Sequence, residues 1–266
     1  MEGDICDENL CETLCNQVDY ILHQGALGSV PRSIDEPLLY DKNNITGTNT
    51  LFNAARNTGV KKIVYASSSS VYGDTKTLPK HEGMQLNPKS PYALSKATNE
   101  AFSTLFSQLY GLPTVGLRYF NVFGAKQNPK SQYAAVIPSF VTACLENKPI
   151  PIHGDGKQTR DFTYIENVIN ANLNACQSDS STNGKAYNVG CGEQISILEL
   201  ATMIKEITNS HSDIQHLPER AGDIKHTRAS IDELRKDIDS TAPISLQDGM
   251  KHTIEWYKSS YQKVLK

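Results

Sequence analysis

The stretch IVYASSSSVYGDTKTLPKHEGMQLNPKSPYALSK, residues 63–96, decides how the rest of the chain is interpreted. It opens as an apolar strand over residues 63–66 and continues into four consecutive serines, residues 67–70. After a loop, the pattern predicts a helix that contains Tyr92 and, four residues later, Lys96. Residues four apart lie on the same face of a helix, one turn from each other. We therefore expect the phenol and the ammonium group to be neighbours close to the serine run.

This combination of side chains has a specific chemical use. A lysine ammonium beside a phenol favours the phenolate, so we expect Lys96 to lower the pKa of Tyr92 below its usual value of about 10. A serine hydroxyl at the end of the preceding strand can share a substrate proton with that phenolate. Such a group moves a proton on a carbinol while a hydride leaves its carbon. Taken alone, a Tyr–Lys pair at this spacing usually marks a solvated helix face, and a serine run can be a polar turn.

Length, net charge and cysteine pattern limit the classes of protein to which this chain can belong. A chain of 266 residues suits one large domain, or a domain with a smaller lobe. Its net charge of −3 gives no reason to expect nucleic acid or an anionic membrane as a partner. No apolar run approaches the roughly 20 residues of a transmembrane helix, and the acidic start MEGDICDENL is not typical of a signal peptide. The six cysteines form no C-x-x-C pair and no metal-site pattern, which predicts reduced thiols, a cytoplasmic location and no metal.

Strands and helices alternate along the first two thirds of the chain. We predict strands at 19–23, 62–66, 114–119 and 186–189, and helices at 36–58, 91–110 and 164–176. Gly59 is expected to cap the first of these helices, and Ser90 with Pro91 to begin the second. A later helix should begin after Ser196, with Glu199 completing a capping box. This alternation predicts a parallel sheet with helices on both faces.

The sequence contains only some of the motifs expected of a dinucleotide-binding site. Such a fold normally starts with a strand, a glycine-rich turn and a helix, followed by an acidic residue about 20 positions later. The sequence contains no such glycine fingerprint. The loop at residues 24–30 leaves the carboxyl end of a predicted strand, which is where open α/β sheets bind ligands. A plain turn between strand and helix would have the same composition, so both interpretations stand.

Nine segments are spread over essentially the whole chain, in this order: HQGALGSVPRS, NNITGT, SSSSVYGD, SPYALSK, LRYFNVFG, AAVIP, GDGKQTRDFTYI, YNVGCGE and ERAGDIKH. Together they resemble the extended short-chain dehydrogenase/reductase superfamily. The match is to NAD-dependent nucleotide-sugar 4-epimerases (the NAD-dependent epimerase/dehydratase family), especially the bacterial UDP-N-acetylglucosamine 4-epimerase group.

The resemblance implies an α/β fold: a Rossmann-like parallel sheet lacking its first βαβ unit, with a small mixed α/β substrate lobe. Residues 1–120, plus about 154–190, would form the NAD-binding domain, and residues 121–153 and 191–266 the lobe. Roughly the first 60 residues of a full-length relative have no counterpart here. Without that unit's first strand, the fourth strand of the family's sheet would have an exposed edge. We expect either a piece of a functional epimerase or a remnant that no longer catalyses.

The resemblance also implies roles for individual residues. Tyr92 is similar to the catalytic acid/base, Lys96 to its partner that holds the nicotinamide ribose, and Ser68 to the hydroxyl that bonds the 4-hydroxyl of the sugar. The implied contacts to the cofactor NAD are Asp4, Ile5, Gln24, Gly25, Ala26, Asn44, Tyr92, Lys96 and Phe120. The implied substrate contacts are Ser29, Ser69, Ser70, Asn121, Ala135, Val136, Arg160, Arg220 and Asp223. Arginine suits diphosphate binding because its planar fork meets phosphate oxygens in pairs, although surface ion pairs would also explain these charges.

The implied reaction is 4-epimerisation of a UDP-sugar through a 4-keto intermediate. Related 4,6-dehydratases and decarboxylases need an acidic residue after the catalytic serine or threonine, and Ser69 and Ser70 cannot supply one. Small residues at 70, 135 and 227 favour N-acetylated sugars, UDP-GlcNAc and UDP-GalNAc, with UDP-Glc/UDP-Gal and uronic-acid forms left open. The resemblance further implies a homodimer through a helix bundle that includes the Tyr92 helix, and a role in polysaccharide synthesis. A silent nucleotide-sugar-binding protein and a UDP-4-keto-sugar reductase are the alternatives.

Overall fold

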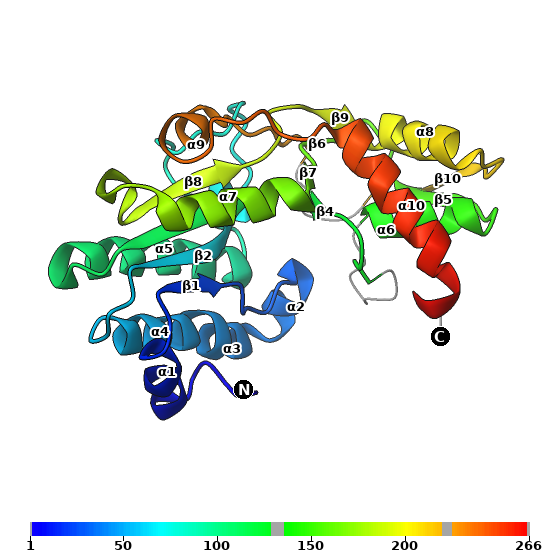
Figure 1. The fold of residues 1–266 in the computed structure, drawn as a ribbon. Helices are drawn as coiled ribbons and strands as arrows, with labels where there is room; N and C mark the ends of the chain where they lie inside the picture. Colours follow the sequence, from blue (N-terminus) through cyan, green and yellow to red (C-terminus); the bar gives the residue numbers. More distant parts are fainter. Residues whose placement is uncertain (1, 129–135, 220–224, 265–266) are drawn as a thin grey trace. The chain divides into compact units, whose positions relative to one another are not determined.

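The computed structural model describes residues 2–128, 136–219 and 225–264, and the chain forms two compact units (Figure 1). Unit 1 contains Met1–Tyr119, Ile169–Val189 and Ser230–Thr241, and unit 2 contains Phe120–Val168, Gly190–Ala229 and Ala242–Lys266.

The division differs from the expected one in two segments. Residues 154–168 belong to unit 2 because their short strands β6 (Thr159–Arg160) and β7 (Thr163–Tyr164) pair with strands of that unit. Residues 230–241 belong to unit 1 because their helix α9 (Asp232–Asp237) packs on β8 (Lys185–Val189).

Unit 1 is built on a parallel sheet of four strands, as predicted. Its order is β1 (Tyr20–His23), β2 (Lys62–Ser68), β3 (Thr114–Tyr119) and β8. The registers are parallel throughout, which confirms the Rossmann-like α/β prediction. Within the described part of the chain β1 pairs with β2 alone, so the sheet has an open edge at β1.

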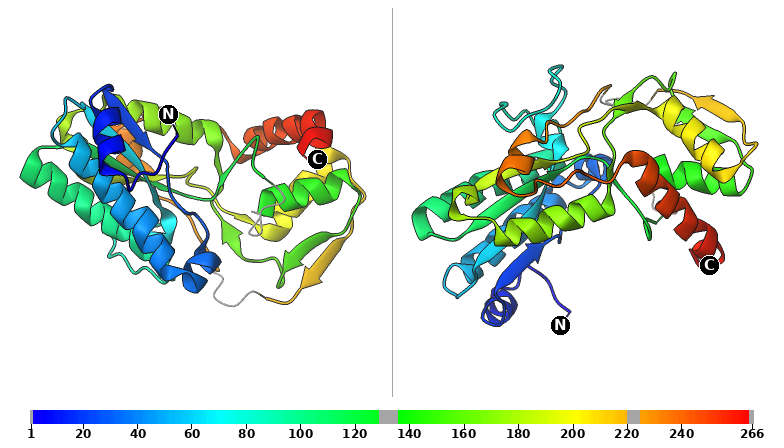
Figure 2. Two further views of the ribbon diagram at one scale, coloured as in Figure 1. Left: turned by 90° about the horizontal axis from the view of Figure 1, so that it is seen from below. Right: turned by 45° about the horizontal axis from the view of Figure 1, so that its top comes forward.

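Two helices cover one face of this sheet. Helix α5 (Pro91–Tyr110) packs on β2, β3 and β8, and α4 (Gly47–Ala55) lies beside it (Figure 2). Helix α1 (Glu8–Cys15) packs in turn on α4 (Figure 1). A hydrophobic cluster that includes Phe52, Ile63 and Tyr65 fills the space between α1, α4 and the sheet. The remaining elements of unit 1 are α2 (Val30–Asp35), α3 (Pro37–Tyr40), a π-helical turn (Asp41–Thr46), the 3-10 turns Ser69–Tyr72 and Ser180–Thr182, and most of α7 (Ile165–Gln177).

The prediction for α5 is confirmed at both ends. The hydroxyl of Ser90 accepts the backbone N–H of Ala93 at 3.1 Å, Pro91 occupies the first position, and Gly111 ends the helix with φ 66°. The prediction that Gly59 caps the helix at 36–58 is wrong. That stretch is α3, the π turn and α4, and α4 ends at Ala55. Arg56 is its C-cap and donates its backbone N–H to the Phe52 carbonyl, and the hydroxyl of Thr58 donates to the Ala55 carbonyl at 2.8 Å.

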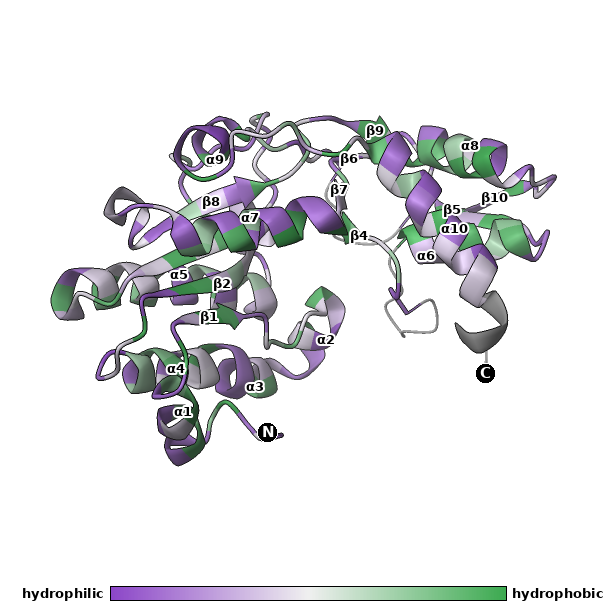
Figure 3. Ribbon diagram, viewed as in Figure 1, coloured by the Kyte–Doolittle hydropathy of each residue, from purple (hydrophilic) through white to green (hydrophobic). Residues whose placement is uncertain are grey.

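Unit 2 packs three helices around short strands. Strands β5 (Ile150–His153) and β10 (Ile214–Leu217) pair in parallel, β4 (Val122–Phe123) pairs with β7, and β6 pairs with β9 (Ile195–Ser196). Helices α6 (Val136–Leu145), α8 (Ile197–Thr208) and α10 (Leu246–Val264) bury their apolar sides in one core. In Figure 3 apolar and polar residues alternate along these helices. The predicted capping box of Ser196 and Glu199 is present at the start of α8. Among the described residues, no helix combines the length and the apolar character needed to cross a bilayer.

Candidate active site

The first turn of α5 brings Tyr92 and Lys96 together at the carboxyl end of β2. The Lys96 ammonium lies 5.9 Å from the centre of the Tyr92 ring and donates to the carbonyl of Ala66 at 2.8 Å. Lys96 is only 4% exposed, so this cation is held inside the unit. The strand thus anchors the lysine, and the helix sets the phenol one turn away, as the four-residue spacing predicts.

Burial determines how these two groups titrate. Burial lowers the pKa of Lys96 to about 8, because a charged ammonium loses solvation there. Burial also raises the pKa of Tyr92, and a hydrogen bond with Ser68 opposes that rise. The expectation of a lowered Tyr92 pKa is therefore wrong for this structure. The physical reason is that desolvation of the phenolate is the largest influence on this pKa, while the Lys96 ammonium is directed at the Ala66 carbonyl.

The serine run turns the chain at the end of β2. Ser68 is the last residue of the strand and caps the 3-10 turn that follows, accepting the N–H of Ser70 at 3.2 Å. Its hydroxyl also lies 2.7 Å from that of Ser70. Gly73 then reverses the chain with φ 61°. Of the four serines, Ser68 is the one whose hydroxyl opposes the rise in the pKa of Tyr92, and its catalytic role stays a prediction.

Asn44 connects the loop after β1 to the helix that carries Tyr92. Its amide oxygen accepts the N–H of Leu27 at 2.8 Å, and its amide nitrogen donates to the Leu27 carbonyl at 3.1 Å. The same nitrogen donates to Ser95 at 3.2 Å, and Ser95 donates to the carbonyl of Tyr92 at 2.8 Å. This arrangement fixes the loop beside the first turn of α5. Gly25 and Ala26, in the same loop, are exposed.

A buried histidine supports Asn44 and was missed by the sequence reasoning. His23 Nε2 lies 2.9 Å from the hydroxyl of Thr48, which itself donates to the carbonyl of Asn44 at 2.7 Å. Asn99 donates to the same carbonyl and the same hydroxyl, at 2.9 and 3.2 Å. Because the hydroxyl proton of Thr48 is already used, His23 Nε2 is the donor. The segment HQG drew attention to the loop, but its sequence gives no sign of a partner 25 residues away.

The other residues expected at the cofactor lie in varied surroundings. Asp4 is exposed and accepts the N–H of Cys6 at 2.9 Å, and Ile5 packs against Gly47 at the start of α4. Gln24 bonds both Tyr119 and Asn172 at 3.0 Å. Phe120 is completely buried and belongs to unit 2.

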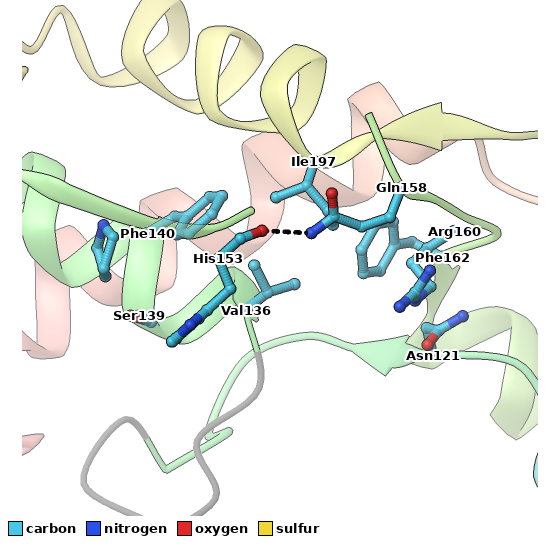
Figure 4. Close-up of a pocket in the computed structure, with 10 residues that line it drawn as sticks. Asn121, Val136, Ser139, Phe140, His153, Gln158, Arg160, Phe162 and Ile197 are labelled. Carbon is cyan, nitrogen blue, oxygen red and sulfur yellow. Dashed lines mark hydrogen bonds between the residues drawn. The ribbon is translucent and has the colours of Figure 1, made fainter. Parts of the chain in front are cut away.

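Unit 2 contains a cavity of about 190 Å³ lined by three of the expected substrate residues (Figure 4). These are Asn121, Val136 and Arg160. Arg160 donates to the carbonyls of Thr159 and Lys225, at 2.9 and 3.3 Å. The other residues that line the cavity were not predicted: Ser139, Phe140, Pro151, His153, Gln158, Phe162 and Ile197.

Backbone geometry positions Asn121 in this cavity. It adopts a positive φ of 33° and donates to the carbonyl of Asp161 at 2.7 Å. Gln158 donates to the carbonyl of His153 at 2.8 Å, as Figure 4 shows. The segment GDGKQTRDFTYI contains both Gln158 and Phe162, so the order of motifs located this wall without showing which side chains form it. Ser29 lies in unit 1, where its hydroxyl caps α2. The predictions for Ala135, Arg220 and Asp223 lie outside the described residues.

The donor set around Lys96 fits the ribose end of a nicotinamide nucleotide. Within the described chain one N–H of its ammonium bonds Ala66, which leaves two for the neighbouring hydroxyls of a ribose. The loop that Asn44 fixes presents exposed backbone at Gly25 and Ala26 at the carboxyl end of the sheet.

Comparison with known proteins gives one consistent result. A model of the NAD dependent epimerase/dehydratase family matches residues 1–190. The chain is 33% identical over 264 residues to a UDP-glucose 4-epimerase of Mycolicibacterium smegmatis, covering 98% of this chain and 83% of that protein. It superposes with TM-score 0.93 and 40% identity on a UDP-N-acetylglucosamine 4-epimerase of Methanobrevibacter ruminantium, solved with UDP-N-acetylmuramic acid (98% and 83% covered). A UDP-glucuronic acid 4-epimerase of Bacillus cereus, solved with UDP-glucuronic acid and NAD, superposes with TM-score 0.88 and 30% identity (97% and 81% covered).

Proposed function

The chain belongs to the NAD-dependent epimerase/dehydratase family, and from this premise we propose that it 4-epimerises a UDP-sugar, with UDP-GlcNAc and UDP-GalNAc as the favoured pair. NAD is the cofactor of this family. The observation that carries the proposal is the group formed by the buried Lys96 and the half-buried Tyr92 and Ser68. The N-acetylated sugar is favoured by the small side chain at Ser70 and by similarity to the epimerase of Methanobrevibacter ruminantium.

Each residue of this group has a proposed task. When bound, NAD would supply the acceptor for a hydride from C4 of the sugar and the donor for its return to the opposite face. Tyr92 removes the proton of the 4-hydroxyl as the hydride leaves, and gives a proton back to the 4-keto oxygen when the hydride returns. Ser68 orients the 4-hydroxyl. Lys96 holds the ribose and supplies the positive charge that the phenolate form of Tyr92 needs.

The serine run separates this activity from those of related enzymes. A dehydratase or a decarboxylase must move a second proton, which in the related enzymes requires an acidic residue beside the catalytic serine or threonine. Here those positions are Ser69 and Ser70, and neither is an acid at physiological pH. A 4-epimerase needs one acid/base, which is consistent with Tyr92.

The proposed function is tested by incubating the purified chain with NAD and UDP-GlcNAc and following the appearance of UDP-GalNAc by NMR. Conversion to an equilibrium mixture without net consumption of NAD is expected. Tyr92→Phe should reduce turnover to background, because the ring remains and the proton-transferring hydroxyl is lost. Near-normal turnover by Tyr92→Phe would overturn the proposed role of Tyr92. Stoichiometric consumption of NADH with a 4-keto sugar would identify a reductase instead.

The cavity of unit 2 supports a nucleotide-binding role that does not depend on NAD. Arg160 is a suitable partner for a diphosphate, and Phe162 provides an aromatic wall for a base. This observation keeps the silent nucleotide-sugar-binding protein as the second candidate. A calorimetric titration with UDP, followed by an assay with a UDP-sugar and NAD, distinguishes the two. Binding of UDP without NAD, together with no turnover of the UDP-sugar after NAD is added, would favour the silent binder.

We also propose that the protein is a cytoplasmic homodimer that acts in polysaccharide synthesis. All six cysteines are free thiols, which is typical of a reducing compartment. Helix α5 exposes Leu94, Leu105 and Leu109, and such an apolar stripe is a suitable surface for a second copy. Nucleotide sugars are the glycosyl donors that a polysaccharide synthase would consume.

A further inference from the structure

The buried ion pair of Glu100 and Arg118 has no role in the proposed reaction. Its side chains are only 9% and 7% exposed, and they form a bidentate contact: Arg118 Nη2 to Glu100 Oε2 at 2.7 Å, and Arg118 Nε to Glu100 Oε1 at 2.9 Å. Two charges are rarely buried for stability alone, because apolar side chains of similar volume stabilise a core as well or better. The pair therefore calls for another explanation.

The pair is the centre of a network that crosses the carboxyl half of the sheet. Ser67 donates to Glu100 at 2.5 Å, Arg118 donates to the Tyr72 hydroxyl at 2.7 Å, and Tyr72 donates to Asn188 at 2.6 Å. Ser67, Arg118 and Asn188 are register partners on three neighbouring strands, so they lie on one face of the sheet. That face is covered by α5, which supplies Glu100.

Both ends of this network adjoin the proposed catalytic residues. Glu100 lies on α5 one turn beyond Lys96 and two turns beyond Tyr92. Ser67 immediately precedes Ser68, and Tyr72 closes the 3-10 turn that Ser68 caps. The network therefore joins the helix that carries the phenol and the ammonium to the strand end that carries the serine. Removing the Glu100 carboxylate would leave the guanidinium of Arg118 buried without its counter-charge. It would also break the contacts of Glu100 with Arg118 and with Ser67.

We propose that Glu100 and Arg118 are positioning residues that set the distance between Ser68 and the Tyr92–Lys96 pair. This inference rests on the proposed function, because residues can be positioned for catalysis only if Ser68, Tyr92 and Lys96 catalyse the proposed reaction. A merely structural network would lower stability and leave the catalytic geometry of the folded molecules intact. A positioning network must instead affect turnover more than substrate binding. A misplacement of about 1 Å can cost about 100-fold in rate, which sets the expected size of the effect.

The test compares Glu100→Gln with Lys62→Met, which serves as the matched control. Lys62 is a buried cation at the opposite end of β2, 4% exposed, with its ammonium donating to Ser178, Asp179 and Thr182. Both variants should lower the melting temperature. Only Glu100→Gln should lower kcat, by about 100-fold, with KM for the UDP-sugar unchanged. Glu100→Asp, which retains the charge, should restore at least part of kcat.

A second readout does not require activity. Hydrogen exchange followed by mass spectrometry should show faster exchange in residues 67–72 and 91–96 of Glu100→Gln and unchanged exchange there in Lys62→Met. If Glu100→Gln does not fold, Ser67→Ala replaces it, because that variant keeps the ion pair and removes only its bond to β2. If the network variant (Glu100→Gln, or Ser67→Ala in its place) and Lys62→Met have the same kcat and the same hydrogen exchange, the inference is overturned. Activity that survives Tyr92→Phe would overturn the proposed function instead, whatever the Glu100 variants do.

Discussion

At the scale of single residues, His23 shows how burial changes an ordinary side chain. Its imidazole is 8% exposed and donates to Thr48. Burial lowers the pKa of His23 to about 4, with a smaller contribution from the charge of Lys96. The folded protein thus holds the neutral ring next to a cation, while the unfolded chain protonates it near pH 6.5. The sequence shows a histidine at this position, but the shift arises from groups that only folding brings together.

This shift predicts acid sensitivity. Above pH 6.5 His23 is neutral in both the folded and the unfolded chain, so its contribution to stability is complete. Between pH 6.5 and about 4 the unfolded chain binds one more proton than the folded chain, so this stability is lost as the pH falls through that range. At 1.36 kcal/mol per pH unit, the loss is about 3 kcal/mol. Urea unfolding between pH 7 and pH 4 should show it, and His23→Gln should reduce the slope. His81→Gln, at an exposed position, is the control; equal slopes in wild type and His23→Gln would contradict the prediction.

At the scale of elements, the turn after the serine run depends on one glycine. Gly73 has φ 61°, and a Cβ there would lie 2.0 Å from the carbonyl oxygen of Asn87. Gly111 has a similar φ of 66° at the end of α5, with open space around it. Gly111→Ala should therefore cost about 1 kcal/mol of unfolding free energy, from backbone strain alone. Gly73→Ala should cost more than about 3 kcal/mol, because the backbone must also move. Equal costs in chemical denaturation would show that the turn can relax.

The same scale shows what sequence patterns predict well. Helix α5 was predicted over its whole length because Ser90, Pro91 and Gly111 act within one or two residues of the ends that they mark. The stretch at 36–58 was predicted less well. It is divided into α3, a π turn and α4, and after the end of α4 at Ala55 the Thr58 hydroxyl bonds the Ala55 carbonyl; none of these features has a distinctive sequence pattern. Local signals define an element when they act through the neighbouring backbone.

At the scale of the whole molecule, the apolar stripe on α5 predicts self-association. Leu94, Leu105 and Leu109 are 54%, 46% and 68% exposed and lie on one face of the helix, at spacings of 11 and 4 residues. Light scattering after size exclusion should give a dimer for the wild-type chain and a monomer for Leu109→Glu. Leu173→Glu is the matched control, since Leu173 is 51% exposed on α7. A monomeric wild type, or a dimer that survives Leu109→Glu, would contradict the proposed interface.

The alternation of strand and helix patterns determined the α/β class and the parallel sheet, and the order of motifs determined the family. Periodicity and short motifs are features that a sequence displays directly, whereas the roles of Ser68, Tyr92 and Lys96 stay predictions from the resemblance. Tertiary structure alone decided the rest: the upward pKa shift of Tyr92, the neutral His23, the walls of the unit 2 cavity and the ion pair of Glu100 with Arg118. Each of these depends on burial, or on partners far apart in the chain. Desolvation and long-range contact are set by packing, and neither has a local signature in the sequence.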